Sequence, residues 1–231
     1  MIELFPEGFE EVDLDDGVEL AAYTDAAGEE RLRAVFQGTS SADVEDDWAN
    51  RWRSFHRPVR IGHLWIGPPW ETPPVGALAV VIDPGLAFGT GNHPTTRLCL
   101  ELLLSLEPTS LLDLGCGSGV ISIAAGKLGF GPLFALDRED QAIAATRRNA
   151  AANRVAVDAQ VGDVLADELP AAELAVANIE LGTASSVVPR LRSPTVMLSG
   201  YVESAHPELA GFGHRERRTL DGWAADLYAR E

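Results

Sequence analysis

The sequence predicts an α/β protein, with a mostly parallel sheet covered by helices on both faces and a small α+β domain before it. Three observations support this. From Thr95 onward, short apolar segments alternate with segments whose apolar residues recur at helical spacing. Near the C-terminus, two strand-like segments flank Asp221-Gly222, and an Asp-Gly pair is typical of a hairpin turn. Hydrophobic residues make up 46% of the 231 residues, enough for one core and a small accessory domain.

The first part of the chain, residues 1 to about 47, mixes short alternating segments (VELAAYT and RLRAVFQ) with acidic turns (DLDDG and DAAGEE). This pattern is typical of a small α+β segment. Asp47 to Val59 is aromatic and basic, and we expect a helix or a connecting arm there. His63 to Pro74 is punctuated by prolines and is expected to be extended. The segment ALAVVIDPG then contains a short strand that ends at a turn.

The second part begins with TTRLCLELLLSL, a helix candidate with a threonine at its start. The expected elements that follow are the strand SLLDLG, the helix GVISIAAGKLG closed by Gly129, the strand LFALD, the alanine-rich helix REDQAIAATRRNAAANR, the strands AVDAQVGD, ELAVANI and PTVMLSG, and two antiparallel strands in HRERRTLDGWAADLYAR. We therefore expect a small domain over residues 1–58, a linker or arm over 59–80 and the α/β domain over 81–231.

Charge and composition exclude several function classes. The net charge is -17, so nucleic acid is not an expected partner, whereas a basic protein is. Solubility alone would explain the acidity equally well. Lys127 is the only lysine and does not complete a P-loop pattern, and its isolation argues against catalysis by a covalent lysine intermediate.

Cysteine usage and hydropathy indicate a cytoplasmic protein. Cys99 and Cys116 share no metal or redox spacing, so we expect two reduced thiols and no metal site. No apolar run is long enough to cross a bilayer, and the acidic N-terminal segment does not resemble a signal peptide.

A glycine-rich loop, Gly115 to Gly119, joins a strand candidate that ends near Asp113 to a helix candidate. Glycines let a ligand approach the backbone, and the start of a helix offers free N–H groups, so this is a nucleotide-type site. The dinucleotide fingerprint requires a third glycine where this chain has Val120, which makes NAD a poor match.

Further polar residues end the next strands. Asp137 has the spacing of about 20 residues that is expected for a carboxylate binding both ribose hydroxyls. Asp163 could accept a hydrogen bond from an adenine amine, and Asn178 ends the following strand. Open α/β sheets bind ligands at this edge. Asp and Asn also end strands simply as turn formers, and for Asp163 alone that explanation is equally good.

Five segments resemble one known family: IDPGLAFGTGNHPTT, DLGCGSGVISIAAGKLG, LDREDQAIAATRRNA, VANI and LWIGPPW. They are similar to the ribosomal protein L11 methyltransferases, which belong to the class I S-adenosylmethionine-dependent methyltransferases. The resemblance runs from about Leu86 to Glu231 and implies a Rossmann-like sheet. It also implies methylation of lysine or N-terminal amines of ribosomal protein L11, with S-adenosylmethionine as cofactor. The cofactor-binding residues that it implies, together with the spacing above, are Thr96, Asp113, Gly115, Gly117, Asp137, Asp163 and Asn178.

The resemblance also assigns roles in the loop before the first helix and at the end of the strand ELAVANI. The loop would fold over the methionine end of the cofactor, with Thr96 in contact and Thr90 and Phe88 lining the same wall. Asn178 would be closest to catalysis, its amide oxygen accepting a hydrogen bond from the acceptor nitrogen. His93 is expected to be a structural hydrogen-bonding residue, because methyl transfer to a neutral amine uses the lone pair of the amine.

The sequence departs from the family in two places. Glu180-Leu181-Gly182 replaces the usual continuation, and Glu180 could pair with a substrate ammonium or simply face solvent. The segment before the linker is shorter than usual, which puts the ribosomal substrate in question. Four tryptophans of the linker region could form a docking surface, although packing onto the catalytic domain is the preferred explanation; they are Trp48, Trp52, Trp65 and Trp70.

Our leading hypothesis is a monomeric cytoplasmic protein N-methyltransferase. Three alternatives remain. The same chemistry could act on another protein or a small amine. The chain would be a non-catalytic cofactor-binding module if Glu180 and the short segment before the linker had abolished catalysis. The retained residues argue against this alternative; they are Thr96, Gly115, Asp137 and Asn178. An NAD-dependent oxidoreductase is disfavoured by Val120.

Overall fold

The computed structural model describes residues 10–14, 17–21, 26–36, 39, 41, 56–84 and 91–231. The chain divides into two compact units, Met1–Arg51 and Trp52–Glu231, each of which is described by itself. In the first unit, strands β1 (Glu10–Leu14) and β2 (Gly17–Ala21) pair antiparallel.

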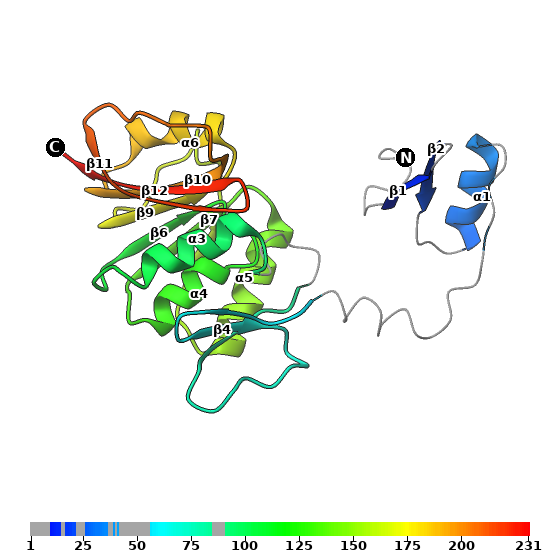
Figure 1. Cartoon of the computed structure of the whole chain (residues 1–231), viewed down its shortest axis with the longest axis horizontal. Coiled ribbons are helices and arrows are strands. Elements are labelled where there is room, and N and C mark those ends of the chain that lie inside the picture. Colours follow the sequence, from blue (N-terminus) through cyan, green and yellow to red (C-terminus); the bar gives the residue numbers. More distant parts are fainter. Residues whose placement is uncertain are drawn as a thin grey trace. The chain divides into compact units, whose positions relative to one another are not determined.

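Helix α1 (Ala26–Val35) completes the described part of the first unit (Figure 1). The prediction of an acidic turn at DAAGEE and an alternating segment at RLRAVFQ was therefore wrong. Ala, Glu, Arg and Leu all have high helix propensity, and Glu29 pairs with Arg33 one turn later. The predicted arm from Asp47 to Val59 lies mostly outside the described residues, as do Trp48 and Trp52.

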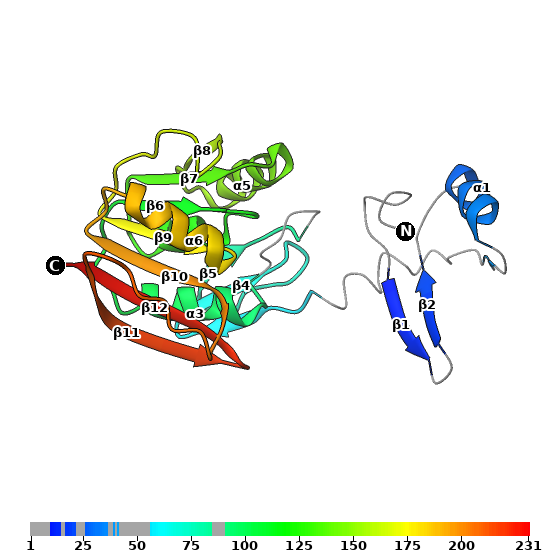
Figure 2. The same cartoon turned by 90° about the horizontal axis from the view of Figure 1, so that it is seen from above.

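The second unit contains a seven-stranded sheet in the order β11-β12-β10-β9-β6-β7-β8 (Figure 2). Its strands are β6 (Leu111–Leu114), β7 (Leu133–Asp137), β8 (Asp158–Val161), β9 (Leu174–Asn178), β10 (Thr195–Val202), β11 (Phe212–Leu220) and β12 (Trp223–Arg230). The strands β8, β7, β6, β9 and β10 are parallel, and β12 pairs antiparallel with both β10 and β11. The predicted fold class, with its antiparallel C-terminal hairpin, is confirmed.

Helices cover both faces of this sheet, as predicted (Figure 1). The helices α3 (Pro94–Leu103), α4 (Val120–Lys127) and α5 (Asp140–Asn153) lie on one face, and α6 (Leu181–Val187) lies on the other, followed by the short 3-10 helix η1 (Val188–Arg190). The central strands are buried on both sides, which explains why β6 and β9 read as continuous apolar runs. Helix α6 was not predicted, because its small and polar residues carry no apolar periodicity.

The segment predicted as a linker or arm contains a second, three-stranded sheet formed by β3 (Val59–Ile61), β4 (Leu64–Gly67) and β5 (Leu78–Val81). Its buried side chains join the core beneath α3 and α4. Helix α5 is tied to this sheet by Asn153, whose amide donates to and accepts from the backbone of Val81. Trp65 is only 4% exposed, so this tryptophan packs inside the unit, as we preferred.

A buried carboxylate joins the antiparallel end of the large sheet. Asp226 on β12 is fully buried and forms hydrogen bonds with the hydroxyl of Tyr201 (2.8 Å), Nε2 of His214 (2.7 Å) and Nη1 of Arg217 (3.2 Å). Arg217 also donates to the carbonyl oxygen of Ala205, in the segment after β10. The Asp226 side chain therefore joins β12 to β10 and β11. Through Arg217 it is also linked to the segment between β10 and β11.

We predict that Asp226→Ala destabilises the second unit by about 3 kcal/mol, because it leaves a buried hydroxyl and a guanidinium without their shared acceptor. Urea unfolding followed by tryptophan fluorescence measures this change. Glu216→Ala is the control, since Glu216 makes only a partly exposed ion pair with Arg218, and such pairs contribute about 1 kcal/mol or less. Equal losses in the two variants would contradict the prediction.

Candidate functional site

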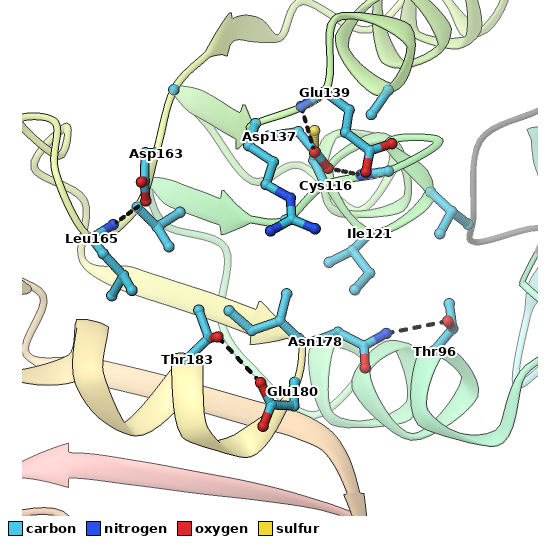
Figure 3. Close-up of a pocket in the computed structure, with 18 residues that line it drawn as sticks. Thr96, Cys116, Ile121, Asp137, Glu139, Asp163, Leu165, Asn178, Glu180 and Thr183 are labelled. Atoms are coloured by element: carbon cyan, nitrogen blue, oxygen red, sulfur yellow. Dashed lines mark hydrogen bonds between the residues drawn. The ribbon is translucent and has the colours of Figure 1, made fainter. Parts of the chain in front are cut away.

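A cavity of about 470 Å³ opens at the carboxyl ends of β6, β7, β8 and β9 (Figure 3). Open parallel sheets bind ligands at this edge, because the loops that leave the strands diverge there. Six of the seven predicted site residues line the cavity: Thr96, Gly115, Gly117, Asp137, Asp163 and Asn178. Six of the predicted residues therefore lie together in one cavity, and Asp113 lies outside its wall.

The glycine-rich loop between β6 and α4 forms part of the cavity wall. The N–H groups of Gly115 and Cys116 both donate to the carbonyl oxygen of Leu136 at the end of β7. Thr146 of α5 donates its hydroxyl to the carbonyl oxygen of Gly117 at 2.9 Å. Gly119 adopts φ +79, and a side chain there would press on Thr146, so only glycine fits the entry to α4. The loop is thus held by the neighbouring strand and helix before any ligand binds.

Asp137 ends β7 with its carboxylate in the cavity wall. One oxygen accepts the N–H of Gly117 at 2.9 Å, and the other accepts the N–H of Glu139 at 3.1 Å. These bonds fix the orientation of the carboxylate and use one lone pair on each oxygen. A carboxylate offers about four acceptor positions, so it can still accept hydrogen bonds from two hydroxyl groups.

Asp113 lies behind the loop, outside the cavity wall. Its side chain is 1% exposed and accepts hydrogen bonds from the N–H (3.2 Å) and the hydroxyl (2.6 Å) of Ser122 on α4. Burial raises the pKa of Asp113 to about 6, although the bonds from Ser122 lower it. Its contacts hold the first turn of α4 under the loop, and direct contact with a ligand stays a prediction.

Asp163 follows β8 and forms the turn that the sequence allowed, while contact with an adenine amine stays a prediction. Its carboxylate accepts the N–H of Leu165 at 2.8 Å, and its own N–H donates to Asp167 at 2.8 Å, so it forms a turn. The residue also lines the cavity. The turn therefore places a carboxylate at the wall opposite Asn178 (Figure 3).

The other side of the cavity is formed by the ends of β9 and α3. The amide nitrogen of Asn178 donates to the hydroxyl oxygen of Thr96 at 3.3 Å, which leaves the amide oxygen as the remaining acceptor of that side chain. Thr96 is 1% exposed, in the first turn of α3. Two residues that lie 82 positions apart in sequence thus form one polar pair.

His93 is the N-cap of α3, and the prediction that it is a structural hydrogen-bonding residue is confirmed. Its Nδ1 accepts the N–H of Thr95, and the Thr95 hydroxyl lies 2.7 Å from the same atom. The ring also packs edge-on against Trp223, with 5.0 Å between ring centroids. The helix was expected to start with a threonine, but Pro94 starts it one residue earlier.

The turn after β9 is packed between two glycines. The side chain of Ile179 occupies the space next to Gly115, where a Cβ would touch its Cγ2. Gly200 lies at the irregularity in β10 between Ser199 and Tyr201, with φ +100. A Cβ on Gly200 would lie only 2.7 Å from the carbonyl carbon of Ile179 and 3.0 Å from its nitrogen. Sequence analysis missed this role, although a glycine inside a strand pattern signals a bulge or a close backbone approach.

Two charged residues of the cavity wall were not predicted from the sequence. Arg138 and Glu139 directly follow Asp137 and line the same cavity. Glu180 also lines it and is exposed to solvent, and its carboxylate accepts a long hydrogen bond from Thr183 at 3.4 Å. Thr90 and Phe88, which were expected in the same wall, lie outside the described residues.

The described part of the chain contains neither a metal-binding cluster nor a membrane-spanning helix. No group of three or more His, Cys, Asp or Glu residues there could hold a metal ion. None of the helices described is long and apolar enough to span a membrane.

Comparison with known proteins gives a consistent result. The sequence model of a family described as "Ribosomal protein L11 methyltransferase (PrmA)" matches residues 10–210. A ribosomal protein L11 methyltransferase of Pasteurella multocida is 46% identical over 157 residues, covering 64% of this chain and 53% of that protein. One of Shewanella sp. strain ANA-3 is 41% identical over 182 residues, covering 73% and 61%. The chain thus spans about half the length of the curated relatives it matches most strongly.

A solved structure shows the same similarity. The crystal structure of a ribosomal protein L11 methylase from Lactobacillus delbrueckii subsp. bulgaricus superimposes with a TM-score of 0.69 at 30% identity. The match covers 76% of this chain and 100% of that one.

We predict that Gly200→Ala destabilises the protein by about 2 kcal/mol or more beyond Gly211→Ala, because only the first variant forces a methyl group into a neighbouring backbone. Gly211 is a matched control: it has φ +77, and a Cβ added there would meet nothing within 4 Å, so it tests the backbone strain alone. Urea unfolding of both variants measures the difference. If the two lose the same stability, the close approach to Ile179 has no energetic weight.

Proposed function

The chain belongs to the ribosomal protein L11 methyltransferase family, and on this basis we propose that it transfers methyl groups from S-adenosylmethionine to lysine or N-terminal amines of ribosomal protein L11. The family match over residues 10–210 supports the reaction class. The observation that carries the proposal is the pairing of Asn178 with Thr96 in the same cavity as the carboxylate of Asp137. This arrangement provides an acceptor for an amine beside a place for a nucleoside.

The described residues fit S-adenosylmethionine, which this family uses. A cavity of about 470 Å³ falls in the usual range for sites that hold small molecules. Asp137 would accept hydrogen bonds from the two ribose hydroxyls, and Asp163 would accept one from the adenine amine. The backbone at Gly115 and Gly117 would lie against the ligand, because no side chain stands in the way. Thr96 would contact the methionine end, and Asp113 would support the loop from behind.

When bound, the cofactor supplies a methyl group activated by its sulfonium charge. The protein must present a neutral, aligned amine, since an ammonium has no lone pair. The amine of a lysine has a pKa of about 10.4 and an N-terminal amine one of about 8, so only a minority is neutral at pH 7. The oxygen of Asn178 accepts an N–H of the neutral amine and orients its lone pair. In the displacement an N–C bond would form as the C–S bond breaks, and the methylated amine would then release a proton to solvent.

The position of Asn178 is fixed by its neighbours. Thr96 accepts from its amide nitrogen, and Gly200 supports the adjacent peptide of Ile179. The amide oxygen therefore needs no rearrangement to accept a hydrogen bond from the substrate amine. Such preorganisation lowers the cost of reaching the transition state. His93 takes no part in this step, because its Nδ1 is engaged with Thr95.

The proposed partner follows from charge and family. A chain with a net charge of -17 attracts a basic protein and repels nucleic acid. Ribosomal proteins are synthesised in the cytoplasm, and we place the reaction there. We assign residues 1–58 to substrate recognition, 59–80 to the connection and 81–231 to cofactor binding and catalysis. We propose that the chain acts as a monomer.

A second candidate is the same chemistry on another protein or a small amine. One specific observation favours it: the chain covers 53% of the length of its relative from Pasteurella multocida. The part that recognises the acceptor in that relative could therefore differ here, while the cofactor site is retained. The non-catalytic module and the NAD-dependent oxidoreductase have no such support, because the wall residues expected of a methyltransferase are assembled in the cavity.

The proposal is tested by incubating the protein with labelled S-adenosylmethionine and purified ribosomal protein L11, followed by peptide mass spectrometry. Label on lysine side chains or on the N-terminus is the expected result. If S-adenosylhomocysteine binds but L11 stays unlabelled, the substrate is another amine. If the cofactor does not bind, the methyltransferase proposal fails.

We predict that Asp137→Ala abolishes the thermal stabilisation given by S-adenosylhomocysteine, because the ribose loses its acceptor. At a hundredfold excess over Kd a ligand stabilises the native state by about 2.7 kcal/mol, which differential scanning fluorimetry detects readily. Asp158→Ala serves as a control of equal charge, since Asp158 is an exposed residue at the start of β8. A normal shift in Asp137→Ala would overturn the ribose assignment.

We predict that Asn178→Ala lowers kcat on the acceptor by about 100-fold while S-adenosylhomocysteine still binds, because the variant loses the group that orients the amine. Single-turnover methylation measures the first effect and calorimetry the second. Thr96→Val keeps the shape of its side chain and removes the hydroxyl that accepts from Asn178, so it should show a smaller loss of kcat. Unchanged turnover in Asn178→Ala would remove this residue from the mechanism.

A further inference from the structure

The charged residues of the cavity wall are unevenly distributed between its two sides. Asp137 ends β7 and is followed by Arg138 and Glu139, and Asp163 follows β8, on the side that we assign to the nucleoside. Across the cavity, the side formed by β9, α3 and α6 contains Asn178, Thr96 and Thr183, which are all neutral (Figure 3). Among the described lining residues, Glu180 is the one charged group on that second side.

The carboxylate of Glu180 is held by the turn that carries Asn178. Gly200 supports the backbone of Ile179, so the residue that follows has a defined starting position. Gly182 leaves room for the side chain, since a Cβ there would lie 3.1 Å from Oε1 of Glu180. The hydroxyl of Thr183 lies 3.4 Å from Oε2. The carboxylate of Glu180 therefore lies over the first turn of α6. It is two residues from Asn178 in sequence and exposed to solvent.

The acceptor needs such a charge before it needs Asn178. A lysine side chain arrives from water as an ammonium ion, because its pKa is about 10.4. The oxygen of Asn178 offers a hydrogen bond but no compensating charge, and a bound sulfonium repels a second cation. A carboxylate at the solvent side attracts the ammonium and accepts one of its hydrogen bonds.

We propose that Glu180 is the docking residue of the acceptor: it binds the protonated primary amine at the mouth of the cavity, from which the amine moves to Asn178 once it has lost a proton. This inference rests on the proposed amine methyltransferase function and adds a subsite to it. The subsite takes a primary ammonium group, either of lysine or of a chain N-terminus. The covalent step is unchanged, and the proton passes to solvent through the exposed side on which Glu180 lies.

Docking at Glu180 favours binding of the amine but disfavours its deprotonation, which the chemical step requires. A carboxylate beside an ammonium stabilises the charged form and raises the pKa of the amine. Glu180 therefore improves capture and delays deprotonation. Removing its charge should weaken acceptor binding and, at the same time, move the rise of kcat with pH to lower pH. A residue that only supports the fold would not produce this pair of effects.

The first experiment uses the complete protein saturated with S-adenosylhomocysteine and titrates it with n-butylammonium chloride at pH 7 and low salt. The amide NMR signals of residues 178–183 report binding. We expect saturable shifts in the wild type and an affinity weaker by roughly three- to fivefold in Glu180→Gln, in line with an exposed ion pair. Glu180→Asp should recover part of the affinity because it retains the carboxylate.

Glu173→Gln is the matched control, because it makes the same change in net charge just before β9, at the opposite end of that strand. It should bind n-butylammonium as the wild type does. The proposal is overturned if Glu180→Gln binds with wild-type affinity, or if the wild type shows no saturable shift at these amides.

The second experiment measures initial rates on ribosomal protein L11 across the pH range in which its amines lose their protons. For Glu180→Gln we expect KM for L11 to rise by roughly three- to fivefold and the midpoint of the kcat profile to fall, with the affinity for S-adenosylhomocysteine unchanged. An unaltered KM would contradict docking by Glu180. If the wild type does not methylate L11, the proposed substrate fails, while the titration with n-butylammonium still decides the role of Glu180.

Discussion

The site depends on the packing of Ile179 between two glycines. Its side chain fills the space beside Gly115, and its peptide lies against Gly200 in the bulge of β10. The first contact belongs to the glycine-rich loop that lines the cavity, and the second to β10, where the antiparallel end of the sheet begins. The distance between this loop and the turn bearing Asn178 is therefore set by the close packing of one side chain and one peptide, which is stiffer than a contact between two long side chains.

Each side of the cavity carries a carboxylate, but the two carboxylates have different surroundings. On the side proposed for the nucleoside, two backbone N–H groups hold Asp137, so its carboxylate is oriented. On the side proposed for the acceptor, Glu180 has one long hydrogen bond and is exposed to solvent, which suits the docking of a cation proposed above. The buried Asp113 has a third role, supporting α4 from behind the loop. Burial and hydrogen bonding, more than residue type, separate the three carboxylates.

The sequence predicted the parallel strands, the helices α3, α4 and α5 and the closing hairpin, because their periodicity and turn residues are local signals. It also predicted residues that meet in one cavity, since Gly115 follows one strand of the parallel sheet and Asp137 and Asn178 end two others. Three features were beyond it for physical reasons. Helix α6 forms although its residues lack an apolar stripe, and α1 was hidden by residues also common in turns. The contact of Gly200 with Ile179 joins two strands, and no local pattern encodes such a pairing.

The strand order has a consequence for folding kinetics. β12 lies between β10 and β11 in the sheet although it follows both in sequence. Until β12 inserts, the facing edges of β10 and β11 have no partner, and unpaired edges are the surfaces through which chains associate with one another. The pairing of β12 with both strands also brings Asp226 to Tyr201, His214 and Arg217, so the polar cluster closes only once β12 is in place. The arrival of one strand thus completes both the sheet and its buried charge network, and a slow arrival would favour aggregation over the native state.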